Sequence, residues 1–285
     1  MMAAIRIISN STSDIPKDIR DKYGIYTLPL CIVLNDKSYY DREEITTKEI
    51  VEWAETNKTT PKTAAATFDR ATELIKKCKE ADEDVIFFGI SEDLSTTCNV
   101  VRLTANDLDY SDRVFVVDTK NLCLGEGLLV LKAIDLIEEG KSAKEIVEIL
   151  EVERDKVVSK FIPSELTFLA RGGRCSASTA LLGNMLQIKP VIKVEDGKMD
   201  VDKKYRGKAG KVMLTFLKDI EEDLRNADPK RVAIARAMLD DATFDAIVDY
   251  VKSLNVFEEI IINEAGGVIM SHCGPGTFGI FYNKK

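Results

Sequence analysis

Short apolar runs alternate with longer amphipathic stretches through the first half of the chain. Strands are predicted where the runs are compact, at residues 5–8, 26–33, 85–90 and 114–117. Helices are predicted between and after them, at 47–56, 69–80, 97–107 and 124–139, and Ser142 with Glu145 forms a capping box that opens one more. This alternation is typical of a parallel sheet joined by crossover helices.

The pattern changes after about residue 158. Apolar runs at 188–194 and 199–201 flank the turn Glu195-Asp196-Gly197-Lys198, which predicts a hairpin. Further strands are predicted at 232–237, 258–263 and 277–282, with helices at 208–225 and 241–253. We therefore expect two domains: an α/β domain with a parallel sheet over 1–157, and an α+β domain with a mostly antiparallel sheet over 158–285. No long linker separates them, so a cleft between the two halves is the expected ligand site.

Charge and composition exclude several classes of protein. The chain has 40 Lys and Arg against 48 Asp and Glu, a net charge of −8, which disfavours nucleic acid and anionic membrane surfaces as partners. Hydrophobic residues make up 45% of the chain, as in an ordinary globular protein. No apolar run approaches the roughly 20 residues that a membrane crossing needs. The N-terminal segment lacks the apolar core of a signal peptide, so a cytoplasmic location is expected.

Cysteine and histidine usage argues against metal or cofactor chemistry. The six cysteines show no CxxC spacing and are expected to be reduced core thiols. One histidine in the whole chain excludes His-rich zinc sites, so no metal is expected. Gly125-Glu126-Gly127 does not complete a dinucleotide fingerprint, and 207–211 does not match a phosphate loop. No cofactor is therefore expected.

Hydroxyl side chains gather after two predicted strands of the first half. They are Ser9, Ser11, Thr12 and Ser13 after the first strand, and Ser91, Ser95, Thr96 and Thr97 after the third. The carboxyl ends of parallel strands border the ligand crevice, so these hydroxyls can line one site. Alternatively, each caps the helix that follows, as Ser95 would before 97–107. The segment 59–67 adds further hydroxyls beside small residues, or is a plain loop.

Two glycine-punctuated segments carry candidate anion-binding groups. Arg171 and Arg174 flank a diglycine and can bind a carboxylate or phosphate, unless they are simply solvated. His272 lies in the glycine-rich turn 266–276, where an imidazole can donate to an anion or move a proton, or can be structural. Arg206 adds another positive group before 207–209.

Several of these segments occur together, in order, in one known family. They are 8–16 (ISNSTSDIP), 62–67 (KTAAAT), 91–97 (SEDLSTT), 118–127 (DTKNLCLGEG), 166–174 (LTFLARGGR), Lys189-Pro190, Arg206-x-Lys208-Ala209 and 272–276 (HCGPG). Each motif alone is weak, but their joint order is specific. The chain resembles, over nearly its whole length, the DegV family of fatty-acid-binding proteins, the acyl-carrying subunits of bacterial fatty acid kinase.

The resemblance implies a function and a set of site residues. The protein would bind a long-chain fatty acid in a tunnel between its domains and present the carboxylate to an ATP-dependent kinase subunit for phosphorylation to acyl phosphate. The carboxylate would be held by Thr63 and Ser95, with Arg171 and His272 close to it, and Arg206 would contribute to kinase docking. Such a protein is a carrier with no turnover alone.

Two other classes of function remain open from the sequence. A small hydrolase could use Ser95 or Cys273 as nucleophile with His272 as base, although no G-x-S-x-G segment accompanies them. A regulatory protein without a ligand is the third possibility. Bound lipid distinguishes the fatty-acid-binding protein from a regulatory protein without a ligand. Reaction with ester substrates identifies the hydrolase.

Overall fold

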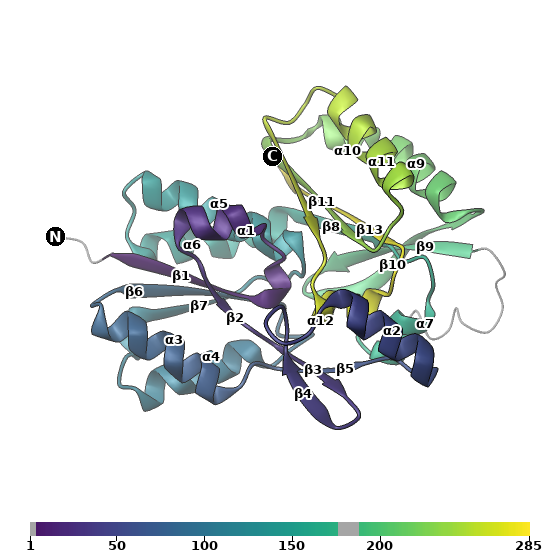
Figure 1. Ribbon diagram of the computed structural model, residues 1–285. Coiled ribbons are helices and arrows are strands. Elements are labelled where there is room, and N and C mark those ends of the chain that lie inside the picture. The colour runs from purple at the N-terminus through teal and green to yellow at the C-terminus, as the bar shows by residue number, and fades with distance from the viewer. Residues whose placement is uncertain (1–3, 176–187) are drawn as a thin grey trace.

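The first half of the chain is built on a parallel sheet. The computed structural model describes residues 4–175 and 188–285 (Figure 1). Four parallel strands form this sheet in the order β2-β1-β6-β7. Their bounds are β1 (Ile5–Asn10), β2 (Tyr26–Leu28), β6 (Asp84–Gly89) and β7 (Val114–Asp118). The predicted parallel sheet is thus confirmed.

Helices cover both faces of this sheet (Figure 1). On one face lie α1 (Lys17–Tyr23), α5 (Leu124–Glu138) and α6 (Ala143–Glu153); on the other lie α3 (Phe68–Glu80) and α4 (Thr97–Asp107). The predicted capping box is present at the start of α6, where Ser142 accepts from the amide of Glu145. Short 3-10 turns occur at η1 (Ser11–Ser13), η2 (Ser111–Arg113) and η3 (Arg154–Lys156).

A small antiparallel sheet extends from the end of β2 toward the second half. Its strand order is β4-β3-β5, with β3 (Cys31–Leu34), β4 (Lys37–Tyr40) and β5 (Lys62–Ala64). Helix α2 (Thr47–Asn57) lies between β4 and β5 along the chain. The prediction of a single strand over 26–33 is wrong, because the segment is divided into β2 and β3. The strand is interrupted at Pro29, which has no N–H, and at Leu30, whose amide donates to Ser11 Oγ at 3.2 Å instead of to a neighbouring strand. Part of the predicted loop 59–67 is strand β5.

The second half contains a six-stranded sheet in the order β10-β9-β8-β13-β11-β12. Its strands are β8 (Val157–Ile162), β9 (Ile188–Glu195), β10 (Lys198–Arg206), β11 (Ala227–Ala237), β12 (Glu259–Glu264) and β13 (Thr277–Lys284). Only β11 and β12 are parallel, so the predicted α+β half with a mostly antiparallel sheet and its hairpin are confirmed. The outer helices are α9 (Ala209–Asp219), α10 (Glu221–Arg225) and α11 (Asp241–Ser253), and the helix predicted over 208–225 is interrupted at Ile220 (Figure 1).

Two short helices lie between the halves. They are α7 (Thr167–Gly172) and α12 (Gly267–Cys273), which contact each other, and α12 also packs on α2 and β3. The sequence interpretation of 266–276 as a turn is therefore wrong for its central part. The helix forms because partners from the first half take its N-terminal amides: Gly266 N–H donates to Asp14 Oδ1 and Gly267 N–H to Asp41 Oδ1, both at 2.9 Å.

The two halves share one continuous apolar core. A single cluster of buried side chains includes Phe88 of β6, Leu129 of α5 and Phe281 of β13. Helix α5 contacts β8, β11 and β13 of the second sheet, and its Asp135 forms a bidentate ion pair with Arg231 of β11 at 2.6 and 2.9 Å. Cys31, Cys78, Cys98, Cys123 and Cys273 are buried free thiols, and Cys175 is also buried. The halves are therefore held as one body around α5.

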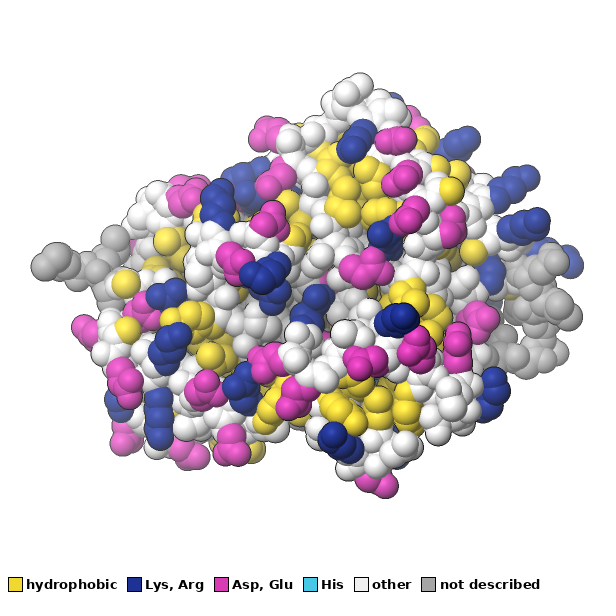
Figure 2. Space-filling model, in the orientation of Figure 1, with side chains coloured by type: hydrophobic (Ala, Val, Ile, Leu, Met, Phe, Trp, Pro, Cys, Tyr) yellow, Lys and Arg dark blue, Asp and Glu magenta, His cyan; other side chains and the backbone are white. Residues whose placement is uncertain are grey.

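The surface carries both signs of charge. Lys and Arg side chains are interspersed with Asp and Glu across the face in Figure 2, and basic side chains gather at its right edge. Within residues 4–175 and 188–285, no helix has the combined length and apolar character that crossing a membrane requires.

Candidate functional site

A cavity of about 280 Å³ lies between the two halves. Its wall is drawn from β5, from the loop that precedes α4, from α12 and from the diglycine segment. The lining residues are Leu30, Thr63, Ala64, Ala65, Ile90, Glu92, Asp93, Leu94, Ser95, Thr96, Leu122, Arg174, Met199, Val268, Ile269, His272 and Cys273. The structure therefore brings Thr63, Ser95 and His272, three of the predicted site residues, to one cavity.

A second, apolar cavity adjoins the first. Leu122, Ile269 and Cys273 also line a second, smaller cavity of about 20 Å³. The other residues around that space are Cys123, Phe161, Ala235, Arg236, Ala237, Ala265, Thr277, Gly279 and Phe281. One wall thus runs from the polar groups of the first cavity into the core between α5 and the second sheet.

Thr63 and His272 form a hydrogen bond across the two halves. Thr63 is central in β5, where it pairs with Ile32 of β3, and its Oγ1 lies 2.8 Å from His272 Nε2 in α12. The other ring nitrogen, Nδ1, is buried without a hydrogen-bond partner among the residues that the structure describes. Burial and the charge of Arg174 lower the pKa of His272 to about 4, so the imidazole is neutral at pH 7.

Ser95 reaches the cavity from the loop before α4. Its Oγ accepts from the amide of Thr97 at 3.4 Å and lies 3.0 Å from Thr97 Oγ1. The helix cap itself is Thr96, which makes no side-chain capping bond. Ser95 is therefore not the N-cap residue of α4, contrary to the capping interpretation, but it accepts from the first amide of that helix and also lines the cavity.

The diglycine segment contributes a different arginine from the expected one. Arg171 is exposed, with one guanidinium nitrogen 3.5 Å from the carbonyl oxygen of Lys58, and it does not line the cavity. Arg174 lines it instead, and also donates to the carbonyl of Gly172 at 2.9 Å. The chain reverses at Gly173, whose φ of +69° is a left-handed conformation that glycine adopts readily. Arg171 precedes this reversal and Arg174 follows it.

Arg206 lies outside this cavity. It is the last residue of β10 and is exposed, together with Lys203, Lys204 and Lys208. These four side chains form a basic edge on the second half, and none of them lines the cavity.

Most of the other predicted hydroxyls support the fold. Ser9 and Ser13 lie 3.1 Å apart, Ser11 accepts from Leu30 as described, and Thr12 donates to the buried carboxyl of Glu126 at 3.0 Å. Ser91 donates to the carbonyl of Gly197 in the β9–β10 turn at 2.7 Å. These contacts tie loops together, so the hydroxyls after β1 are structural.

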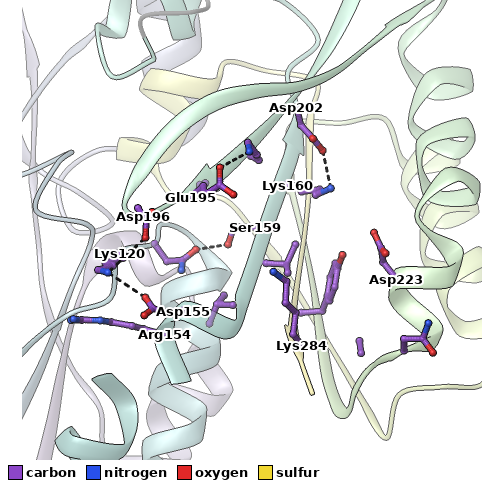
Figure 3. Close-up of a pocket in the computed structure, with 18 residues that line it drawn as sticks. Lys120, Arg154, Asp155, Ser159, Lys160, Glu195, Asp196, Asp202, Asp223 and Lys284 are labelled. Carbon is purple, nitrogen blue, oxygen red and sulfur yellow. Dashed lines mark hydrogen bonds and ion pairs between the residues drawn. The ribbon is translucent and has the colours of Figure 1, made fainter. Parts of the chain in front are cut away.

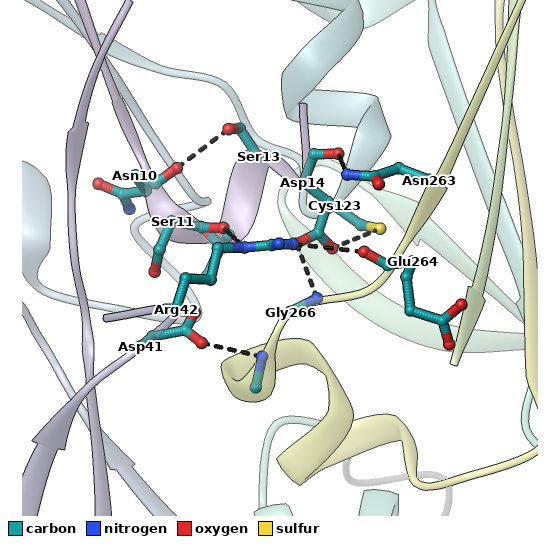
Figure 4. A network of polar contacts seen from close by, with 12 residues as sticks. Asn10, Ser11, Ser13, Asp14, Asp41, Arg42, Cys123, Asn263, Glu264 and Gly266 are labelled. Carbon is teal, nitrogen blue, oxygen red and sulfur yellow. Dashed lines mark hydrogen bonds and ion pairs between the residues drawn. The ribbon is translucent and has the colours of Figure 1, made fainter. Parts of the chain in front are cut away.

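Asp14 is the centre of a network that the sequence did not reveal (Figure 4). Its buried carboxylate accepts from Arg42, from the amide of Gly266 and from Cys123 Sγ at 2.9 Å, and its carbonyl accepts from Asn263. Partners from both halves thus converge on one side chain. The network fixes α12, and with it His272, against the first half.

The arrangement does not favour a hydrolase. His272 Nε2 faces Thr63, whereas the partner of Ser95 is Thr97. Burial raises the pKa of Cys273 to about 12, which keeps it as an unreactive thiol. Across 4–175 and 188–285, no group of three or more His, Cys, Asp or Glu residues is placed to hold a metal ion.

A larger cleft of about 650 Å³ lies elsewhere between the halves and has different chemistry (Figure 3). Five basic and five acidic side chains line it: Lys120, Arg154, Lys160, Lys193, Lys284, Asp155, Glu195, Asp196, Asp202 and Asp223. Several are already paired, as Lys160 is with Asp202 at 2.8 Å. An acyl tail gains nothing among these charges, so this cleft is not suited to an apolar ligand.

The chain is similar to known proteins over its full length. The DegV family model, described as "Uncharacterised protein, DegV family", matches residues 4–285. A DegV domain-containing protein of Clostridium acetobutylicum is 32% identical over 288 residues, covering 100% of both chains. Another, of Deinococcus radiodurans, is 29% identical over 277 residues, covering 97% of each.

Solved structures give the same result. A DegV family protein from Thermus thermophilus, described by its fatty acid binding, matches with a TM-score of 0.89 and 32% identity, covering 99% of this chain and 100% of that one. The Bacillus subtilis protein described as DegV, a fatty acid binding protein, matches with a TM-score of 0.85 and 26% identity, covering 99% and 100%. The similarity therefore extends through both halves of the chain.

Proposed function

This chain belongs to the DegV family, and on that premise we propose that it binds a long-chain fatty acid in the cavity between its halves. The observation that carries the proposal is that Thr63 of β5 and Ser95 of the loop before α4 share one cavity wall with Arg174 and His272. The comparisons support it, because similar structures are described as fatty acid binding proteins.

The tail supplies the affinity in this proposal. It follows the wall formed by Leu122, Ile269 and Cys273 from the larger cavity into the smaller one. Burying ~15 methylenes at about 0.8 kcal/mol each gives an upper limit of about 12 kcal/mol. That is enough for tight capture after ordering costs are subtracted. Rotation of these three side chains joins the two spaces.

The carboxylate head group stays ionised at the polar end of the cavity. An unpaired buried carboxylate would be expelled or protonated, so it needs donors. Thr63 and Ser95 supply hydroxyl groups and Arg174 supplies a positive charge, while neutral His272 lies behind Thr63. We propose that Arg174 is the arginine close to the carboxylate, a role that the sequence resemblance assigned to Arg171.

We further propose that the bound carboxylate is presented to an ATP-dependent kinase subunit. A carboxylate oxygen attacks the γ-phosphorus of ATP, the bond to the β-phosphate oxygen breaks, and acyl phosphate and ADP form. The exposed Arg206 edge is the proposed docking surface. In this scheme the chain acts in the cytoplasm as a carrier, with no cofactor and no turnover alone. We retain 1–157 and 158–285 as the proposed domains.

Extraction of the purified protein tests the binding proposal. Organic extraction followed by mass spectrometry is expected to yield a long-chain fatty acid in near-stoichiometric amount. Delipidated protein should then take up the same acid in a titration. Preparations free of lipid that also fail to take it up would reject the proposal.

A further inference from the structure

The turn between β9 and β10, residues 195–198, meets the first half of the chain at the cavity wall. Met199 of β10 lines the cavity together with residues 92–96, which belong to the loop before α4. The two central residues of the turn, Asp196 and Gly197, have φ angles of +47° and +80°, and both are positive, as a tight two-residue hairpin turn requires. The turn is therefore a compact unit that carries Met199, and this part of the wall is a joint between the halves.

Ser91 fastens the turn to the first half. Its buried hydroxyl group donates to the carbonyl oxygen of Gly197 at 2.7 Å. Its backbone carbonyl accepts from the amides of Leu94 and Ser95 at 2.9 and 3.1 Å. A Cβ at Gly197 would lie 2.5 Å from Ser91 Oγ, so the two segments are in tight contact. One serine thus joins the turn to the loop that presents Ser95 to the cavity.

Two exposed ion pairs are the other polar contacts across this joint. Lys198 Nζ lies 3.7 Å from Asp93 Oδ1, and Lys120 Nζ lies 3.9 Å from Asp196 Oδ1. The side chain of Lys198 is 73% exposed and that of Asp196 is 86% exposed, so water screens both pairs. Each such pair shifts an equilibrium by about fivefold or less. The buried hydrogen bond from Ser91 is therefore the strongest of the three polar contacts.

The turn is held less firmly than α12, the other element of the second half that meets the first half at the cavity. Helix α12 is fixed by the buried Asp14 network, which has partners in both halves. The turn, in contrast, also borders the charged cleft of about 650 Å³, where Glu195 and Asp196 line the wall (Figure 3). The turn therefore has weaker contacts to break than α12, and it has open space beside it in which to move.

We propose that the β9–β10 turn is the gate of the cavity, and that Ser91 is the positioning residue that latches it. In the closed state, Met199 completes the wall beside residues 92–96. Breaking the hydrogen bond between Ser91 and Gly197 lets the turn move toward the charged cleft. The wall then opens between Met199 and Leu94, and a fatty acid enters or leaves. The latch sets the rates of exchange, because the same bond breaks in the free and in the loaded protein. This inference rests on the proposed function.

Exchange kinetics on delipidated protein are the first test. In stopped-flow experiments with cis-parinaric acid, a fluorescent fatty acid, Ser91→Ala is expected to raise the association and dissociation rate constants about fivefold each, since one neutral hydrogen bond shifts an equilibrium by roughly that factor. The dissociation constant should stay within twofold of wild type. Ser253→Ala is the matched control and should change neither rate constant, because Ser253 also donates to a carbonyl oxygen at 2.7 Å, that of Tyr250, but lies in α11.

Lys198→Ala is the second variant, and it changes an exposed side chain that does not line the cavity. It should raise both rate constants by a smaller factor, about twofold, because an exposed ion pair contributes less than a buried hydrogen bond. Unchanged rate constants in both variants would overturn the gate. So would a faster dissociation alone with a matching loss of affinity, because that result identifies a contact with the ligand.

The second test uses the protein without ligand. Relaxation dispersion of backbone ¹⁵N nuclei detects a minor open state that exchanges on the microsecond to millisecond timescale. Exchange is expected at Gly197 and at Leu94, on the two sides of the joint, and the open state should be about fivefold more populated in Ser91→Ala. Absence of exchange at both positions in both proteins would overturn the gate. This readout needs no lipid, so a protein that binds no fatty acid would defeat the proposed function and leave the exchange result standing.

Discussion

The Nε2 atom of His272 lies 2.8 Å from the hydroxyl oxygen of Thr63, although 209 positions separate the two residues along the chain. The bond joins β5 of the first half to α12 of the second half at the polar end of an otherwise largely apolar space. Thr63 is positioned by the pairing of β5 with β3, and His272 is positioned by the Asp14 network, which holds α12. A head-group site is thereby assembled from both halves of the fold.

Thr63→Ala should weaken fatty acid binding by roughly 10- to 150-fold, because a hydrogen bond to a charged group contributes about 1.5–3 kcal/mol. Calorimetric titration of delipidated protein with dodecanoic acid measures this. Thr59→Ala is the matched control, since Thr59 is exposed in the same segment and does not line the cavity. Equal affinities for the Thr63 variant and its control would remove Thr63 from the head-group site.

The two arginines of the diglycine segment should behave differently. Arg174→Gln removes the positive charge that lines the cavity and is expected to lower acid affinity at least tenfold. Arg171→Gln changes a side chain that does not line the cavity and should leave the affinity within twofold of wild type. The same titration run on both variants decides between them, and a larger effect from Arg171 would restore the original sequence expectation.

This pair also shows where sequence reasoning reached its limit. The motif placed two guanidinium groups around a diglycine, but the choice between them depends on the left-handed turn at Gly173 and on the position of α12. Helix α12 itself was missed for a similar reason. Its glycine-rich sequence predicts a turn, whereas Asp14 and Asp41, more than 220 residues away, accept from its first amides. Local propensity contains no information on such partners.

Regular elements with their own local signals were predictable. The capping box at Ser142 and the hairpin turn at 195–198 are fixed by neighbouring residues, and both are confirmed. The cavity residues Thr63, Ser95 and His272 came from motif order, which indicates a shared site without its geometry. The Asp14 network and the charged cleft had no sequence signal, because their members are dispersed along the chain.

Acid should destabilise the protein through His272. Its folded pKa of about 4 lies below its unfolded value of about 6.5, so the unfolded state binds the proton first. The stability contributed by the neutral ring is complete above pH 6.5 and is lost as the pH falls toward 4. Urea unfolding at pH 7 and pH 5 should show a smaller difference for His272→Asn than for wild type. An identical pH dependence would contradict a buried neutral imidazole.

Breaking the Arg42–Asp14 pair should be costly. The Asp14 side chain is 0% exposed, and removing its cation leaves a buried charge that costs about 3–5 kcal/mol. Arg42→Met should therefore lower the free energy of unfolding by about that amount in chemical denaturation. Lys17→Met is the control, because its pair with Asp21 is exposed and contributes about 1 kcal/mol or less. Similar losses for the two variants would show that Asp14 is not isolated from solvent.

A crystal structure of the protein with a bound long-chain fatty acid tests the central claim most directly. The account predicts electron density for the carboxylate within hydrogen-bond distance of Thr63 and Ser95, near Arg174, and for the tail along Leu122, Ile269 and Cys273. Density in the charged cleft around Lys160 and Asp202, or a carboxylate pointing away from the two hydroxyls, would contradict it.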